Sequence, residues 1–164
     1  MSKTLENLME AFAGESQANR KYLAFAKKAD QEGFPRTARL FRAAAEAETI
    51  HAHNHLRAME GVKSTRENLQ EAISRESHEF TEMYPQMIAA AEAEDNKRAA
   101  QTFRYANEVE KVHAALYQQA LDNLDNQTLV DDYICPVCGY TVEGEPPDAC
   151  PVCKAKKKSF IRID

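Results

Sequence analysis

Two Glu-x-x-His motifs stand in register in the sequence and have the residue types and spacing of metal ligands. Glu and His three residues apart lie on one face of a helix, about one turn apart, so both can bind one ion. The motif occurs at 48–51 and again at 110–113. Seven of the 14 positions in 38–51 are identical in 100–113. The repeat predicts two related helix pairs, with Glu48 and His51 facing Glu110 and His113.

Carboxylates on the other two predicted helices complete a donor set. Glu15 lies on the apolar face of the first helix, and Glu79 and Glu82 share a face of the third. Glu15 precedes Glu48 by 33 residues, and Glu79 precedes Glu110 by 31. One Glu from each of two helices, with Glu-x-x-His from the other two, binds two Fe or Mn ions in helix bundles. Burying so many carboxylates without cations would be costly, so we predict a di-metal site.

The two halves of this predicted site differ by one carboxylate. When Glu15 is aligned with Glu79, Glu82 corresponds to Ala18, so the two metals need not have the same ligands. Tyr22 lies two helical turns beyond Glu15 on the same face. Tyr22 therefore either approaches the metals or is a plain core tyrosine, and the sequence favours neither.

The four cysteines form a second predicted metal site. They occur as two Cys-x-x-Cys motifs separated by 11 residues, with the ligands Cys135, Cys138, Cys150 and Cys153. Such paired motifs give tetrahedral sulfur coordination of Zn or of a single Fe, and the spacing does not distinguish the two. Because a redox-active di-metal site needs an electron donor and Zn has no redox chemistry, we predict one iron on four thiolates.

Four helices must position these donors, since apolar residues recur at spacings of three and four up to about residue 126. Turn and cap signals separate the helices: Gly33, Pro35, Ser64 or Thr65, and Asp95-Asn96. Pro85 falls inside the third helix and should kink or split it. Short turns make neighbouring helices antiparallel, which predicts a four-helix bundle.

The remaining segment has a different composition, with Gly, Pro and strand-like pieces at 132–134 and 159–162. Some 35 residues cannot bury enough apolar surface to fold without a cross-link or a structural metal, and a metal bound by the four cysteines would serve this purpose. We therefore predict a mainly α protein with a helical domain over 1–130 and a small metal-binding β domain over 131–164.

Composition excludes several classes of protein. The chain has 164 residues, 43% of them hydrophobic and 29% charged, with a net charge of -5. This charge gives no reason to expect a nucleic-acid partner. No apolar run is long enough to span a membrane, and the N-terminal residues do not read as a secretory signal. We expect a cytoplasmic protein, in which disulfides between the cysteines are improbable.

Over its full length the chain resembles the rubrerythrins. The matching stretches are 11–18 (AFAGESQA), 48–51 (ETIH), 78–85 (HEFTEMYP), 110–113 (EKVH) and the two cysteine motifs. The resemblance implies a ferritin-like bundle with a non-haem di-iron centre, followed by a rubredoxin-like domain with one iron. The implied di-iron ligands are Glu15, Glu48, His51, Glu79, Glu82, Glu110 and His113.

The resemblance also implies an activity. Rubrerythrins reduce hydrogen peroxide to water in oxidative-stress protection, with electrons that come from NAD(P)H through rubredoxin or a reductase. On reduction, one iron exchanges the carboxylate matching Glu82 for the histidine matching His51, which makes Glu82 and His51 candidate catalytic residues. Tyr22 is a third candidate, because of its position on the same helix face as Glu15. The resemblance further implies a homodimer or higher oligomer, with the tail of one subunit near the di-iron centre of another.

Two other functions fit parts of the sequence. A ferroxidase or iron-storage protein would share the di-iron ligands, but it predicts a hollow 24-subunit shell, against which the cysteine-rich tail argues. A zinc-ribbon interaction module on a structural bundle would share the cysteines, and it predicts Zn in the tail and no di-iron centre.

Overall fold

The computed structural model describes residues 2–126 and 128–163. Contacts divide the chain into unit 1 (Met1–Lys63) and unit 2 (Ser64–Asp164), and each unit is described by itself. This division does not coincide with the boundary predicted between residues 130 and 131. The assignment of domains over 1–130 and 131–164 therefore stays a prediction.

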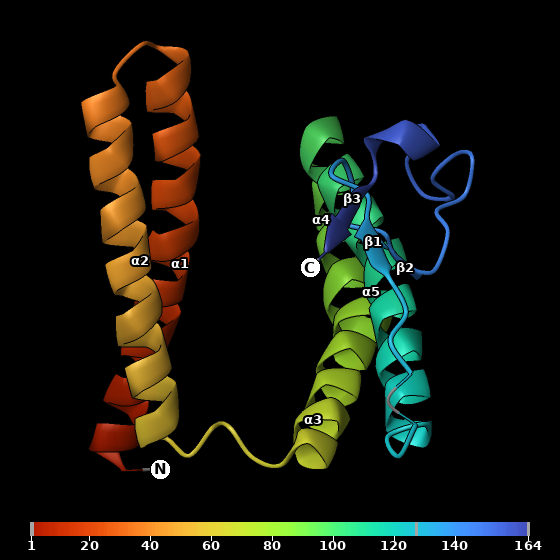
Figure 1. Ribbon diagram of the computed structural model, residues 1–164, viewed down its shortest axis with the longest axis horizontal. Helices are drawn as coiled ribbons and strands as arrows, with labels where there is room; N and C mark the ends of the chain where they lie inside the picture. Colours follow the sequence, from red (N-terminus) through yellow and green to blue (C-terminus); the bar gives the residue numbers. More distant parts are fainter. Residues whose placement is uncertain (1, 127, 164) are drawn as a thin grey trace. The chain divides into compact units, whose positions relative to one another are not determined.

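Unit 1 is a helical hairpin of α1 (Lys3–Gln31) and α2 (Pro35–Ala58), which run antiparallel (Figure 1). The side chain of Ser2 caps α1 by accepting a hydrogen bond from the backbone N–H of Leu5. The predicted turn is confirmed. Gly33 has φ +81°, a conformation that glycine adopts without strain, and Pro35 follows at the first turn of α2.

Small residues let the two helices of unit 1 approach closely. The buried side chains of α1 and α2 are all alanines: Ala26, Ala29, Ala38, Ala45 and Ala52. The side-chain amide of Asn19 on α1 donates to the carbonyl of Ala45 at 2.7 Å and to the hydroxyl of Thr49 at 2.9 Å. These hydrogen bonds satisfy a polar group at the helix contact and fix how α1 and α2 lie along each other.

Unit 2 begins with a helix that is interrupted by a π-helical turn. Its helical elements are α3 (Thr65–His78), the π-turn η1 (Glu79–Met83), α4 (Tyr84–Ala93) and α5 (Lys97–Asp122). The capping box between Ser64 and Glu67 starts α3, as the cap signal predicted. The last helix ends at Asp122, four residues before the expected Asn126.

The π-turn is where the predicted third helix is split. The backbone N–H of Tyr84 bonds the carbonyl of Glu79, five residues earlier. Pro85 has no N–H to continue the α-helical pattern and lies in the first turn of α4, where a proline is tolerated. The expectation that Pro85 breaks the helix is confirmed. A π-turn inserts one residue into a helix and commonly occurs at functional sites.

The tail of unit 2 is a small antiparallel sheet. Its strands are β1 (Asp132–Ile134), β2 (Thr141–Glu143) and β3 (Ile161–Ile163), in the order β2-β1-β3, and a short turn of 3₁₀ helix, η2 (Lys157–Ser159), precedes β3. The strand expected at 132–134 is confirmed, the one expected at 159–162 begins at Ile161, and β2 was not predicted. Cys135 and Cys150 are fully buried among these elements.

Candidate metal centres

The four cysteines of the tail come together in one cluster. Their sulfur atoms all lie within 4.8 Å of one another. Sγ of Cys135 lies 3.5 Å from Sγ of Cys153, and Cys138 lies 3.5 Å from Cys150, so the cysteines are free thiols and not disulfides. Four sulfur donors in this arrangement suit a tetrahedral Fe or Zn ion.

Burial and hydrogen bonds shift the pKa values of the tail thiols in opposite directions. Burial raises the pKa of Cys135, but hydrogen bonds from the backbone N–H groups of Val137 and Cys138 and with the neighbouring thiols outweigh it, so the pKa of this thiol is lowered overall. For Cys138 and Cys153 burial dominates, and their pKa values are raised. Each Cys-x-x-Cys motif is followed by a left-handed residue, Gly139 at φ +86° and Lys154 at φ +64°. Their N–H groups close the two turns by bonding the carbonyls of Cys135 and Cys150.

Unit 1 contains the first cluster of carboxylate and histidine donors. Atoms of Glu15 on α1 and of Glu48 and His51 on α2 lie within 4.8 Å of one another. Nδ1 of His51 is 3.0 Å from Oε2 of Glu48, as the i, i+3 spacing predicted. The two side chains differ in exposure, 54% for His51 and 18% for Glu48, so the histidine lies at the edge of the cluster.

Unit 2 contains a matching cluster with one unexpected member. Atoms of Glu76 on α3 and of Glu110 and His113 on α5 lie within 4.8 Å of one another. Nδ1 of His113 is 2.7 Å from Oε2 of Glu110. All three residues are half-buried. Glu110 and His113 are predicted site residues, whereas Glu76 is not among the residues predicted from the sequence.

The carboxyl group of Glu76 is strongly perturbed. Burial and the neighbouring carboxylate of Glu110 raise its pKa from 4.5 to about 7, while His113 partly offsets the effect. Two carboxyl groups held together in a half-buried position are unfavourable unless a proton or a cation neutralises them. This cluster therefore has the chemistry of a cation site, and its oxygen and imidazole donors suit Fe or Mn.

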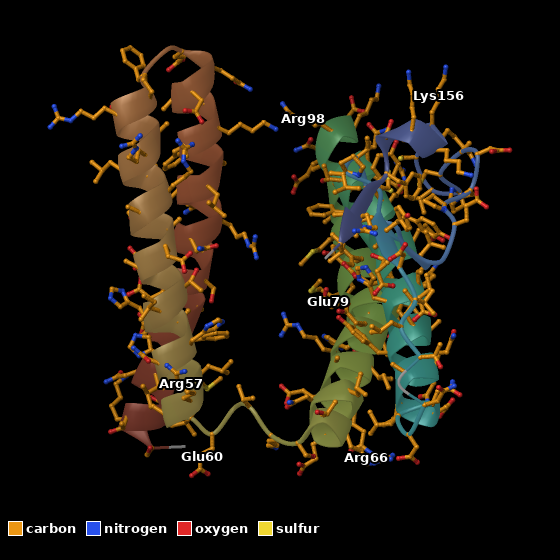
Figure 2. All side chains as sticks on the ribbon, in the orientation of Figure 1. Arg57, Glu60, Arg66, Glu79, Arg98 and Lys156 are labelled. Atoms are coloured by element: carbon orange, nitrogen blue, oxygen red, sulfur yellow. The ribbon has the colours of Figure 1, made fainter. Side chains whose placement is uncertain are left out.

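The two carboxylates predicted on the third helix lie in different surroundings. Glu79 stands where α3 passes into η1 (Figure 2), with 14% of its side chain exposed, and forms an ion pair with Arg75 at 3.2 Å. It is close enough to Glu76 and Tyr84 to raise the pKa of both. Glu82 is 66% exposed and lies 3.6 Å from His78. The structure does not bring Glu82 to the cluster.

The π-turn displaces Glu76 by one residue from the repeat, which conceals its relation to Glu15 in the sequence. Glu48 and Glu110 are 62 residues apart, and so are Tyr22 and Tyr84. Glu15 and Glu76 are only 61 apart, because η1 adds a residue between Glu76 and Tyr84. The spacing to the Glu-x-x-His motif could have identified Glu76. Glu15 precedes Glu48 by 33 residues, whereas Glu76 precedes Glu110 by 34 and Glu79 precedes it by 31, so Glu76 matches the first half better.

Tyrosines at matching positions pack against phenylalanines in both units. The ring centre of Tyr22 lies 6.3 Å from that of Phe41 in unit 1, and Tyr84 lies 6.3 Å from Phe103 in unit 2. Tyr22 also contacts Phe25 at 6.2 Å. Burial, followed by the charges of Glu110, Glu79 and Glu76, raises the pKa of Tyr84 above its usual value. Tyr84 therefore lies near the cluster of unit 2, and it is not among the residues predicted from the sequence.

The tail and α5 meet within unit 2. Nε2 of His113 lies 3.0 Å from the hydroxyl oxygen of Thr141 on β2. The amide of Gln119 donates to Glu143 at 3.2 Å. The cysteine-rich tail is therefore in direct contact with a carboxylate–histidine cluster of its own chain.

Two family profiles match the sequence. The profile described as Rubrerythrin matches residues 6–121, and that described as Rubrerythrin, rubredoxin-like domain, matches residues 133–161. Rubrerythrin-2 of Clostridium acetobutylicum is 37% identical, over 96% of this chain and 95% of that protein. Nigerythrin of Nitratidesulfovibrio vulgaris is 36% identical, over 98% of this chain and 86% of its own. The structure of fully reduced, all-ferrous nigerythrin covers 99% of this chain and 88% of its own, with 35% identity and a TM-score of 0.61.

These similarities confirm the predicted fold class, mainly α with a small C-terminal rubredoxin-like β domain. With the two kinds of donor cluster, they also confirm the predicted cofactors, a di-iron centre and one iron on four cysteines. Among the described residues, the helices are either too short or too polar to cross a membrane.

Proposed function

Because the chain belongs to the rubrerythrin family, an iron-dependent family of oxidoreductases, we propose that it is a peroxidase that reduces hydrogen peroxide to water. The observation that carries the proposal is the contact between the tail and His113, since it joins a one-electron iron site to the helical donor set. The overall reaction is H₂O₂ + 2 e⁻ + 2 H⁺ → 2 H₂O. When bound, the two irons supply the two electrons.

We assign the helical ligands from the clusters. The proposed set is Glu15, Glu48 and His51 from unit 1, with Glu76, Glu110 and His113 from unit 2. Glu79 takes the role that the resemblance gave to Glu82, because Glu79 is close to Glu76 and largely covered, whereas Glu82 is exposed. With the corrected offset of 61 residues, Glu79 is also the additional carboxylate that corresponds to Ala18.

We propose that the hydroxyl groups of two tyrosines, Tyr84 and Tyr22, assist the reaction at the oxygen atoms of peroxide. A tyrosine hydroxyl is protonated at neutral pH, and the raised pKa of Tyr84 favours this form further, so Tyr84 can donate a hydrogen bond to a peroxide oxygen near Glu110. Tyr22 holds the matching position in unit 1 and is proposed for the same task. We propose Cys135, Cys138, Cys150 and Cys153 as the ligands of the tail iron, which receives electrons from a redox partner linked to NAD(P)H.

Location and assembly are part of the proposal. Four reduced cysteines fit a reducing compartment, which supports the cytoplasm. A homodimer or higher oligomer is supported by the large apolar side chains that unit 1 leaves exposed, such as Leu40 at 70% and Ile50 at 54%. Light scattering on the purified protein measures this state directly.

The reaction is tested by stopped-flow mixing. The fully reduced protein is mixed with hydrogen peroxide in one experiment and with dioxygen in another, and oxidation of the helical site is followed by its absorbance. The proposal predicts much faster oxidation by peroxide. Oxidation by dioxygen at an equal or higher rate would refute the peroxidase assignment and favour a ferroxidase.

A further inference from the structure

The two Glu-x-x-His histidines differ in what holds the far side of the ring. Both point Nδ1 toward the glutamate three residues earlier. Nε2 of His113 also contacts the hydroxyl of Thr141, whereas in the described part of the chain no hydrogen bond from Nε2 of His51 is present. His113 is accordingly less exposed, 26% against 54%.

The hydroxyl of Thr141 has its own hydrogen already committed. Oγ1 donates to the carbonyl of Gly139 at 3.0 Å. A hydroxyl has one hydrogen to donate and two lone pairs to accept with. A carbonyl oxygen can only accept, so both contacts of Oγ1 are hydrogen bonds only when its hydrogen points to Gly139 and Nε2 of His113, 3.0 Å away, carries the hydrogen that Oγ1 accepts.

Placing the hydrogen on Nε2 decides which nitrogen can bind metal. A histidine binds metal as the neutral imidazole, which carries one hydrogen. With that hydrogen on Nε2, Nδ1 keeps the lone pair that binds the ion. Nδ1 is the atom that faces Oε2 of Glu110 and lies in the cluster with Glu76. Partners on the far nitrogen of a metal-binding histidine fix the ring and its tautomer, and removing them typically weakens metal binding 10–100-fold.

The tail holds Thr141 firmly in this position. Gly139, whose carbonyl accepts from Thr141, directly follows the ligand Cys138 and is left-handed at φ +86°. A Cβ placed on Gly139 would lie 3.8 Å from the side chain of Val109 on α5, so the loop runs close to this helix. The antiparallel pairing of Thr141 with Ile134 of β1 fixes the backbone of Thr141 in the sheet.

We propose that Thr141 is a positioning residue for the helical metal site. Its hydroxyl accepts a hydrogen bond from the Nε2–H of His113, and this orients the ring so that Nδ1 faces the ion. The rubredoxin-like tail then has a second role besides carrying an iron: it supplies a structural contact to a ligand of the other centre. The proposal rests on the assignment of His113 as a ligand under the proposed function, but not on the reaction with peroxide.

The first test compares metal affinity in matched variants of the full-length protein. The tail is filled with Zn²⁺, and Co²⁺ is titrated into the helical site and followed by its visible absorption. Thr141→Val, which keeps the shape but removes the hydroxyl, should weaken Co²⁺ binding about 10–100-fold. Thr141→Ser should restore binding, and Thr102→Val, on an exposed part of α5, should leave it unchanged.

Two results of the titration would overturn the proposal. One is Thr141→Val binding Co²⁺ as tightly as the wild type. The other is Thr141→Ser losing as much affinity as Thr141→Val, since the hydroxyl would then not be the group that matters. If Thr141→Val weakened Co²⁺ binding as expected but the iron-loaded wild type did not reduce peroxide, only the proposed function would be refuted.

A second measurement uses the wild-type protein and does not depend on how a variant folds. In the protein filled with Zn²⁺ at both sites, ¹⁵N NMR of the histidine rings should show a slowly exchanging hydrogen on Nε2 of His113. The corresponding hydrogen of His51 should exchange faster, because in the described part of the chain its Nε2 has no partner like Thr141. A hydrogen found on Nδ1 of His113 would contradict the proposal.

Discussion

Glu76 is held against a second carboxyl group, that of Glu110, in a half-buried cluster that also contains His113. A cation relieves the repulsion between the two carboxylates, so Glu76 should contribute directly to metal binding. Glu82, six residues further along, is exposed and should contribute nothing. These two residues of the same type on one helical segment make a matched pair for mutation.

We expect Glu76→Gln to lose at least one of the two helical irons, while Glu82→Gln keeps both. Iron analysis with the visible spectrum checks this, since the wild type should hold about three Fe per chain when both centres are filled. If Glu82→Gln were the variant that lost iron, the ligand assignment made from the clusters would be wrong.

The raised pKa of Glu76 predicts a pH dependence of the metal-free protein. Between pH 4.5 and about 7 the folded chain keeps a proton that the unfolded chain has already released. The free energy of unfolding should therefore decrease as the pH rises through this window, and the contribution is lost above it. Urea denaturation at pH 5 and at pH 7.5 measures the decrease.

In the metal-free Glu76→Gln variant this part of the pH dependence should be absent, and in Glu82→Gln it should remain. The same proton competes with metal, because ligands bind in the deprotonated form. Metal uptake by the helical site should therefore release protons below about pH 7 and become tighter as the pH rises to that value. An unchanged pH dependence in Glu76→Gln would contradict the pKa assigned to this residue.

At the scale of elements, close contact through alanines holds the helices of unit 1 together. Ala45 is 1% exposed, and its carbonyl accepts the amide of Asn19 from the opposite helix. A larger side chain here must push the helices apart, so Ala45→Leu should lower the free energy of unfolding by about 1–3 kcal/mol. Ala43→Leu, on the exposed side of the same helix, should change it by less than about 0.5 kcal/mol.

Chemical denaturation of the metal-free variants compares the two substitutions. Binding of metal would add its own stabilisation and obscure the difference. Equal effects of Ala45→Leu and Ala43→Leu would mean that the alanine contact does not limit how closely α1 and α2 pack.

Most helix boundaries could be predicted because their signals are local. Gly33, Ser64 and Pro85 each act through their own backbone or side chain, and each marks a change in the structure where it was expected. The π-turn could not be predicted, since an extra residue in a helix changes no composition or apolar pattern. The sequence pattern matched Glu79 with Glu15, whereas the structure places Glu76 with Glu110 and His113.

Other features depended on contacts between distant residues. The three-residue strand β2 is too short for a pattern, and it exists because it pairs with β1. Its contact with His113 joins residues 28 apart in the sequence. Thr141 therefore had no signal in the sequence, whereas the four cysteines, whose spacing itself specifies the site, did.

At the scale of the whole molecule, the proposed function depends on electrons reaching the helical site through the tail. Zinc in the tail would keep its fold but cannot change oxidation state. We expect protein with Zn²⁺ in the tail and reduced iron in the helical site to react once with peroxide at the normal rate. Sustained turnover with a reductase and NAD(P)H should be lost.

The protein with iron in both sites is the control, and turnover is measured as peroxide consumed per chain. Full turnover with Zn²⁺ in the tail would show that electrons reach the helical site without the tail iron. A Cys150→Ser variant should also lose sustained turnover, because it removes a buried ligand of the tail cluster.

The packing of β2 on α5 has a consequence for how the protein acquires its iron. Thr141 contacts His113 and Glu143 contacts Gln119, so an ion that orders the tail also orders a ligand of the helical site. Such coupling is reciprocal: each site raises the affinity of the other by the same factor. In a cell short of iron, we expect chains to be either completely filled or completely empty, with few molecules caught half-loaded.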